Sequence, residues 1–280
     1  MKTDERTTLV LGGTGKTGRR VVQRLKARGL PVRVGSRAGD PPFQWHDPAT
    51  WAPVLRNVEA AYVAYYPDLA VPGATDTIRA FAAQAVASGV RRLVLLSGRG
   101  EVEAQRSEEA VRDSGAEWTL LRSSWFAQDF SEHFLLDQVL SGEVALPVGS
   151  VTEPFVDAED IADVAVAALT EDRHAGELYE LSGPRLLTFA GAVAEIAQAS
   201  GREIRYVEVP MTAYARALAE HGVPAEFVAL ITYLFTEVMD GRNAHLTDGV
   251  QRALGRTPRD FRDYARQAAA TGVFATPRAA

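Results

Sequence analysis

Short apolar runs alternate with longer amphipathic segments through the first half of the chain. The runs are almost uninterrupted, which is typical of strands buried on both faces of a parallel sheet. The intervening segments carry apolar residues at helical spacing, as at Val21, Val22 and Leu25. This alternation predicts an α/β fold built on a doubly wound parallel sheet. The expected strands are Leu9–Leu11, Pro31–Gly35, Val58–Tyr65, Arg91–Ser97 and Trp118–Arg122, and the expected helices are Thr17–Arg28, Thr75–Ser88 and Val102–Ser114.

The first strand–helix junction carries glycines at Gly12, Gly15 and Gly18. Gly12 permits a tight turn, Gly15 allows backbone to approach a phosphate, and Gly18 allows helix and strand to pack closely. The following helix directs its free N–H groups and positive dipole end at the anion. A Walker A loop requires a further glycine where this chain has Val10, so its spacing excludes that loop. An ordinary strand-to-helix turn is the alternative, but the triplet favours a Rossmann domain that binds a dinucleotide.

The pattern changes after Ser123. Trp125–Leu140 is expected to be helical, Glu143–Val148 extended, Asp160–Leu169 helical, and Glu177–Ser182 a strand that rejoins the sheet. The later segments, a helix over Phe189–Ser200, a strand over Ile204–Val209 and further helices, have no simple place in the parallel sheet. We therefore expect an NAD(P)-binding Rossmann domain over 1–183, with 123–175 contributing partly to the substrate cleft. A smaller α/β substrate-binding lobe is expected over 184–280, with the ligand site between the two.

The end of the second expected strand indicates which dinucleotide is preferred. An acidic residue at this place binds the ribose hydroxyls of NAD, but this chain has Ser36 and Arg37. A hydroxyl and a guanidinium suit a 2′-phosphate, so NADP(H) is preferred over NAD(H). Lys16 would add positive charge near the phosphates. Asp47 is a candidate contact for the adenine amino group, and a helix cap before Pro48 is an equally good interpretation.

Composition narrows the class of protein. A net charge of −6 and a pI near 5.5 argue against a nucleic-acid-binding surface. The chain has no cysteine, so it has no thiol nucleophile or thiolate metal site, and its five histidines lack the spacing of metal ligands. Met1–Thr8 is charged, so we expect no signal peptide there, and no apolar run approaches the length of a membrane span. We expect a cytoplasmic protein that acts on a small molecule, without a nucleic-acid or membrane partner.

Four segments carry a resemblance to a known family: Gly12–Gly18, Val90–Ser97, Ser114–Arg122 and Pro154–Asp163. They resemble the NmrA-like, atypical short-chain dehydrogenases/reductases, and together they span most of the chain. The resemblance implies a Rossmann fold with bound NADP(H) or NAD(H), in a family that mixes reductases, quinone-type reductases and inactive redox sensors. It further implies that the ends of the third, fourth and fifth strands line the nicotinamide. The implied cofactor contacts are Gly12, Thr14, Gly15, Lys16, Thr17, Gly18 and Arg37, with Tyr65, Ser97, Ser123, Trp125 and Phe126 at the nicotinamide.

The chain departs from that family at the proton donor. Typical short-chain dehydrogenases use Tyr-x-x-x-Lys, whereas the segment after Ser97, Glu101–Glu109, has neither tyrosine nor lysine. Some atypical members use a lone lysine there; Ala104 lies near that position and Arg106 is the nearby cation, but arginine donates protons poorly at neutral pH. The candidate catalytic residues are therefore Ser97, Tyr65 and Arg99, with Tyr66, Glu101, His133 and Tyr233 as further candidate donors.

Each of these assignments has a plainer interpretation. The tyrosines can be packing residues at the rim of a pocket, and Trp125 and Phe126 can form either an apolar wall or ordinary core. The favoured function is an NADPH-dependent reductase acting on a small conjugated or aromatic carbonyl or quinone. The alternatives are a non-catalytic NADP(H) sensor that regulates a protein partner, and an isomerase or epimerase with a resident nicotinamide. Whether the chain forms a homodimer stays open.

Overall fold

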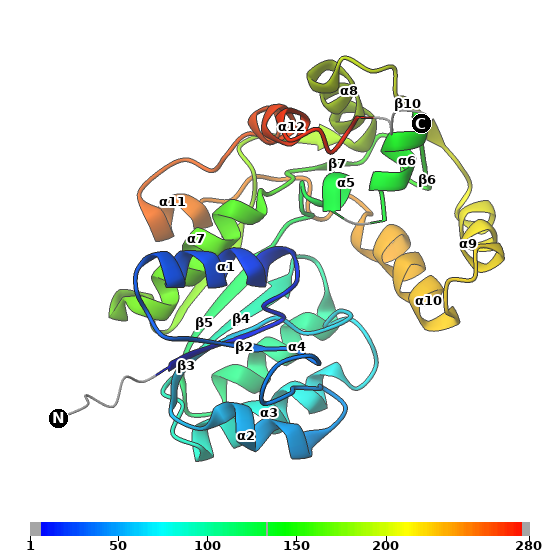
Figure 1. Cartoon of the computed structure of the whole chain (residues 1–280). Coiled ribbons are helices and arrows are strands. Elements are labelled where there is room, and N and C mark those ends of the chain that lie inside the picture. The colour runs from blue at the N-terminus through cyan, green and yellow to red at the C-terminus, as the bar shows by residue number, and fades with distance from the viewer. Residues whose placement is uncertain (1–6, 133, 276–280) are drawn as a thin grey trace. The chain divides into compact units, whose positions relative to one another are not determined.

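A computed structural model describes residues 7–132 and 134–275 of the chain (Figure 1). Its contacts divide the chain into two units that interleave along the sequence. From the sequence we expect a single division of the chain, between residues 183 and 184. The first unit comprises Met1–Ser123, Ala158–Leu181 and Asp248–Arg256, and the second comprises Ser124–Asp157, Ser182–Thr247 and Thr257–Ala280.

The first unit contains a parallel sheet of six strands in the order β2-β1-β3-β4-β5-β8. Apolar side chains from both faces of the strands are buried, as the uninterrupted apolar runs require. The Rossmann-type doubly wound sheet is confirmed, and so is the return of Glu177–Leu181 to pair with β5. The strands are β1 (Thr7–Leu11), β2 (Val32–Gly35), β3 (Val58–Val63), β4 (Arg92–Gly98), β5 (Glu117–Ser123) and β8 (Glu177–Leu181).

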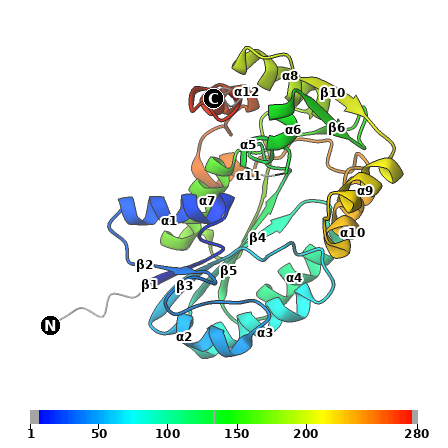
Figure 2. The same cartoon turned by 45° about the vertical axis from the view of Figure 1, so that its right-hand side comes forward.

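Helices cover both faces of this sheet (Figures 1 and 2). On one face α1 (Lys16–Ala27) packs against α7 (Ala158–Thr170), and on the other α3 (Ala74–Ala87) lies between α2 (Trp51–Leu55) and α4 (Val102–Arg112). α11 (Gly249–Leu254) packs on α7 and β8. A Cβ at Gly249 would lie 2.1 Å from the carbonyl oxygen of Glu180, so α11 begins in direct backbone contact with β8. Two 3₁₀ turns complete this unit, η1 (Pro48–Thr50) and η2 (Asp172–His174).

The second unit is built around an aromatic core. Phe130, Phe155, Phe189 and Phe261 are buried with ring centroids 5.0–6.0 Å apart. Its strands form two small sheets, parallel β6–β10 and antiparallel β7–β9. The strands are β6 (Glu143–Leu146), β7 (Thr152–Glu153), β9 (Leu187–Thr188) and β10 (Arg205–Glu208). The helices are α5 (Asp129–Glu132), α6 (Leu136–Ser141), α8 (Phe189–Ser200), α9 (Met211–Glu220), α10 (Ala225–Tyr233) and α12 (Phe261–Ala270), with a π-helical turn, η3, over Leu234–Val238.

The expectation of one helix over Trp125–Leu140 is wrong. The segment starts extended, because the amide of Val156 donates to the carbonyl of Trp125 and the amide of Ala127 donates to the carbonyl of Val156, both at 2.9 Å. The amide of Trp125 also donates to Glu153 Oε1 at 3.1 Å. These bonds to a distant segment replace the helical ladder, and only the short helices α5 and α6 form.

Across residues 7–132 and 134–275, the helices are too short or too polar to cross a bilayer.

Candidate functional site

The glycine-rich turn joins β1 to α1 at the carboxyl edge of the sheet. Gly12 has a φ of +66°, and its carbonyl oxygen accepts the amide of Gly15 at 2.9 Å. A Cβ at Gly18 would lie 2.2 Å from that same carbonyl oxygen, so only glycine lets α1 approach the turn this closely. Gly12 also lies against Ala64, the first residue beyond β3. The turn therefore has the tight shape that a diphosphate seat requires.

The start of α1 fits an anionic ligand. Gly15 occupies the N-cap without a side-chain cap, and the first turn contains no acidic residue. Gly15 has no side chain that could cap the first N–H groups of the helix. Behind them Thr17 is buried, and its hydroxyl accepts a hydrogen bond from Tyr62 at 3.0 Å. Thr14 and Gly15 are exposed on the outer side of the turn, with Lys16 half-buried beside them.

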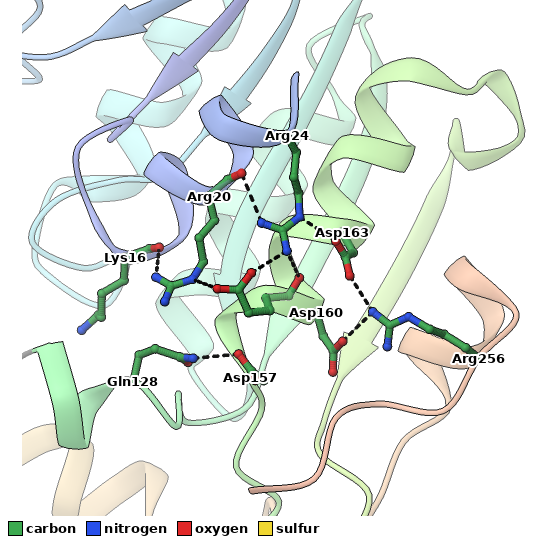
Figure 3. Close-up of polar contacts among 9 residues, drawn as sticks. Lys16, Arg20, Arg24, Gln128, Asp157, Asp160, Asp163 and Arg256 are labelled. Atoms are coloured by element: carbon green, nitrogen blue, oxygen red, sulfur yellow. Dashed lines mark hydrogen bonds and ion pairs between the residues drawn. The ribbon is translucent and has the colours of Figure 1, made fainter. Parts of the chain in front are cut away.

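Two arginines tie α1 to α7 (Figure 3). Arg20 donates to the carbonyl of Lys16 at 2.7 Å and to Glu159 at 2.5 Å. Arg24 donates to Glu159 at 2.5 Å and to Asp163 at 2.6 Å. Burial alone would raise the pKa of Glu159, but the hydrogen bonds from Arg24 and Arg20 outweigh it and lower that pKa. Through Arg20, which binds both the Lys16 carbonyl and Glu159, the network fixes the first turn of α1 to α7.

A third arginine extends the same network. Arg256 donates to Asp160 at 2.7 Å and to Asp163 at 2.6 Å, and Asp160 is fully buried. Arg256 follows α11, so the acidic face of α7 joins three separate segments of the first unit.

The turn after β2 carries the residues predicted to select the dinucleotide. The carbonyl of Ser36 accepts the amides of Gly39 and Phe43, at 3.0 and 2.9 Å, so Ser36 is fixed in a turn. Arg37 is exposed and forms no ion pair with a carboxylate among the described residues. Asp47 accepts the amide of Ala49 at 3.1 Å and caps η1, which is the second interpretation offered for it. An adenine contact of Asp47 stays a prediction.

The ends of β3 and β4 carry two of the predicted catalytic residues. Tyr65 is half-buried, with its ring 4.9 Å from that of Trp45, and it packs on the core of the first unit. Ser97 is buried in β4 and donates its hydroxyl hydrogen to Glu108 at 2.7 Å. Because that hydrogen is already engaged, Ser97 can offer a ligand its lone pairs more readily than its proton.

A charged network surrounds Ser97. Arg122 of β5 donates to both oxygens of the buried Glu108, at 3.0 and 2.5 Å, and to Glu180 of β8 at 2.8 Å. The hydrogen bonds that Arg122 donates to Glu108 raise the pKa of Arg122, although burial opposes them. Arg99 is buried at the end of β4, where Nε lies 3.8 Å from Glu180 and the amide donates to the carbonyl of Ser123 at 3.0 Å. The structure therefore brings Ser97, Arg99 and Ser123 together at the ends of β4 and β5.

Two carboxyl groups form a pair beyond β3 and β4. Asp68 and Glu101 are joined by a side-chain hydrogen bond, and the amide of Ala70 donates to Asp68 at 2.8 Å. Burial raises the pKa of Glu101 well above its usual range, and the negative charge of Asp68 raises it further. Sequence reasoning placed Glu101 among the further candidates but missed Asp68.

Tyr66, in the first unit, is exposed, and Trp125, Phe126 and Tyr233 lie in the second unit. Trp125 packs its ring 5.7 Å from Phe189 and 5.4 Å from Phe235, and its indole N–H is buried without a hydrogen-bond partner among the described residues. Phe126 is half-buried and forms a β-bridge with Val156. Tyr233 ends α10, and His133 lies outside the described residues.

Curated relatives align along almost the whole chain, although no protein-family model matches it. Agroclavine dehydrogenase of Claviceps fusiformis is 32% identical, over 92% of this chain and 96% of that protein. The (4-alkanoyl-5-oxo-2,5-dihydrofuran-3-yl)methyl phosphate reductase of Streptomyces griseus is also 32% identical, over 91% of this chain and 95% of that protein. The chain belongs to the NmrA-like, atypical short-chain dehydrogenases/reductases. It is accordingly an NAD(P)H-dependent oxidoreductase.

Solved structures show the same fold at lower identity. A quinone oxidoreductase of Escherichia coli complexed with NADPH superposes with a TM-score of 0.77 at 20% identity, covering 93% of this chain and 99% of that one. NmrA, a negative transcriptional regulator, gives a TM-score of 0.68 at 16% identity, covering 96% and 98%. The NmrA-like Rossmann architecture thus accommodates chains with different roles.

This NmrA-like chain has no tyrosine or lysine on α4, as its sequence implies. Ala104, near the position of the family's lone lysine, is fully buried, and Arg106 is an exposed residue paired with Glu103 at 2.6 Å. Neither can deliver a proton to a ligand. Within the described residues, the acidic and histidine side chains form no cluster suited to a metal ion.

The structure also identifies residues that sequence reasoning missed. Glu108, Glu159 and Asp163 were given no functional role from the sequence, yet each holds an arginine of another element. One signal was available: Arg122 interrupts an apolar strand, and a charge in a buried strand requires a partner.

Proposed function

We propose that this chain is an NADPH-dependent reductase that transfers hydride to a small conjugated or aromatic carbonyl or quinone substrate. Two features together carry the proposal. One is the tight glycine turn, followed by a helix start without a side-chain cap, and the other is the exposed Arg37 after β2. The first suits a diphosphate and the second a 2′-phosphate. In this proposal Gly12, Gly15 and Gly18 hold the diphosphate with Thr14, Lys16 and Thr17, and Ser36 and Arg37 hold the 2′-phosphate.

The nicotinamide, when bound, supplies the hydride. The chain must position the acceptor and provide one proton. We place Tyr65, Ser97, Arg99 and Ser123 at the nicotinamide, because they follow β3, β4 and β5 at the edge where such folds bind ligands. Trp125 and Phe126 would add an apolar surface. Ser97 would accept a hydrogen bond from the ligand, since Glu108 holds its proton.

Two observations support the substrate class. Trp45 and Tyr65 are partly buried near the end of β3, with ring centroids 4.9 Å apart, and they suit a flat unsaturated ligand. The names of a relative and a structural neighbour describe a carbonyl-bearing dihydrofuran and a quinone. Such conjugated acceptors need less help from a strong acid than simple ketones, which agrees with the missing Tyr-x-x-x-Lys pair.

Arg37→Ala tests the cofactor preference. A charge-assisted contact to a phosphate contributes about 1.5–3 kcal/mol, so the Kd for NADPH should rise about 10–100-fold, while the Kd for NADH stays unchanged. Arg28→Ala, which removes an exposed arginine at the end of α1, is the matched control and should alter neither Kd. Equal affinity of the wild type for the two cofactors would refute the role of Arg37.

The second candidate is a non-catalytic NADP(H) sensor that regulates a protein partner. The absence of tyrosine and lysine on α4 favours it. It predicts tight NADPH binding with no NADPH oxidation across a panel of quinones and conjugated ketones. Turnover of any member of the panel at the rate of an ordinary enzyme would exclude it.

A further inference from the structure

The Asp68–Glu101 pair lies at the carboxyl edge of the sheet in the first unit. Asp68 follows β3 on the loop to α3, and Glu101 is the N-cap residue of α4, just after β4. β3 and β4 pair in parallel, so both loops leave the sheet at the same edge. The glycine-rich turn leaves there too, because β1 pairs in parallel with β3 and Gly12 lies against Ala64. The pair is therefore on the edge where ligands of this fold bind.

A glycine makes room for the carboxyl group of Glu101. A Cβ at Gly98 would lie 2.0 Å from Glu101 Oε1 and 2.4 Å from its carboxyl carbon. Glu101 is 8% exposed, so its side chain folds back over the last residue of β4 instead of extending into solvent. Any other residue at position 98 would push the carboxyl group out of this place.

Burial and the neighbouring carboxylate favour the protonated form of Glu101. The hydrogen bond between the two groups favours the protonated form of Glu101 and the ionised form of Asp68, so the Glu101 hydroxyl donates to the Asp68 carboxylate. Burial raises the pKa of both groups, and the negative charges of Asp68 and Glu108 raise the pKa of Glu101 further. Two neighbouring carboxyls that cannot both ionise are a known way to keep one acid protonated at neutral pH.

The other charged groups at this edge are engaged with one another. Glu108 accepts from Ser97 and Arg122, and Glu180 accepts from Arg122 and lies near Arg99. Two carboxylates thus bind Arg122, and the Ser97 hydroxyl donates a hydrogen bond to one of them. Among the described residues at this edge, Glu101 is the carboxyl group whose pKa is raised well above its usual range.

We propose that Glu101, paired with Asp68, is the proton donor of the reduction, in the role that tyrosine and lysine play in typical relatives. The proposal rests on the reductase function proposed above. As hydride adds to the carbonyl carbon, the C–O π bond breaks and its electron pair moves to oxygen. The O–H bond of Glu101 breaks, the proton joins that oxygen to give a hydroxyl, and Glu101 becomes a carboxylate. Water then returns a proton to the pair.

Glu101→Gln in the full-length protein is the first test, with Glu103→Gln as the matched control. Glu103 lies on the same helix but pairs with Arg106 at the surface. General acid catalysis contributes about 10²–10⁴-fold, so kcat for a conjugated ketone should fall about 100-fold or more in Glu101→Gln and stay unchanged in Glu103→Gln. The Kd for NADPH should stay within twofold of wild type in both variants. Infrared spectra at pH 7 should show a protonated carboxyl band in the wild type and in Glu103→Gln, and none in Glu101→Gln.

Asp68→Asn gives a second, independent readout should Glu101→Gln fail to fold. It removes the neighbouring negative charge, so the pKa of Glu101 should fall and the basic limb of the kcat profile should move to lower pH. Three results would overturn the role of Glu101 while the reductase function stands. These are a wild-type kcat in Glu101→Gln, the lack of a protonated carboxyl band in the wild type, and a basic limb that does not move in Asp68→Asn. A wild type that binds NADPH but reduces no carbonyl or quinone overturns the proposed function, and the role of Glu101 with it.

Discussion

Gly18→Ala examines whether the close contact between α1 and the glycine turn is what shapes the dinucleotide site. The new Cβ would lie 2.2 Å from the carbonyl oxygen of Gly12 and 2.7 Å from its carbonyl carbon. Both are backbone atoms, so no side-chain rotation can relieve the clash. Restoring ordinary contact at about 3.5 Å requires the turn and the helix to separate by about 1 Å.

The expected losses follow from that displacement. Overpacking costs about 1–3 kcal/mol, and alanine regains up to about 1 kcal/mol over glycine inside a helix, so the free energy of unfolding should fall by about 1–2 kcal/mol. A shift of about 1 Å lengthens hydrogen bonds from the start of α1 to a phosphate beyond their useful range. Losing one such charge-assisted bond weakens binding by about 1.5–3 kcal/mol, so the Kd for NADPH should rise at least about tenfold.

Calorimetric titration with NADPH and urea denaturation measure the two effects. Gly191→Ala is the control, because Gly191 is likewise the third residue of its helix, and its new Cβ would meet only side-chain atoms, the nearer being Thr188 Oγ1 at 3.3 Å. That variant should leave both stability and NADPH affinity close to wild type. If Gly18→Ala binds NADPH within twofold of wild type, the turn does not hold the diphosphate in the way proposed.

Two further predictions concern buried ionisable groups. Glu108→Ala leaves Arg122 without its bidentate partner and should lower the free energy of unfolding by about 3 kcal/mol. The control is Glu109→Ala at the exposed neighbouring position, which should change that free energy by less than about 0.5 kcal/mol. Urea denaturation measures both. Equal effects would contradict the network. Burial lowers the pKa of His174 below its ordinary 6.5, so the unfolded chain binds the proton more readily than the folded one. The stability from neutral His174 is complete above pH 6.5 and is lost as pH falls below it, by at most about 1.4 kcal/mol per pH unit. His174→Gln should flatten the dependence between pH 7 and 5, and an unchanged slope would show that other groups cause it.

Local patterns predicted most of the first unit. The apolar runs from Leu9 to Arg122 placed five strands within two residues of their observed ends, because a strand buried on both faces leaves a continuous signal in the sequence. The glycine spacing placed the turn before α1, because each glycine answers a steric demand within a few residues of itself. Such features need no knowledge of distant partners.

Features that depend on distant partners were harder to predict. The segment after Ser123 has helical periodicity, yet Trp125 is extended because its backbone bonds to Glu153 and Val156. Glu159 and Asp68 are ordinary polar residues in the sequence, and only the fold brings them to Arg24 and Glu101. Charge pairing between distant residues leaves no periodic signal in the sequence, so the acid pair could not be predicted. The cofactor turn could be predicted, because its glycine spacing is local.

The pairing of Arg20 with Glu159 has a consequence for the order in which the protein can be assembled. The two residues are 139 positions apart, so a ribosome must complete more than half of the chain before the helix behind the glycine turn gains its anchor. β5 likewise acquires its outer neighbour, β8, only after residues 177–181 emerge. A nascent chain that ends at Ser123 would hold the entire glycine turn while lacking the acidic face that supports it. We therefore expect competence to bind the dinucleotide to arise late in synthesis, after α7 has formed.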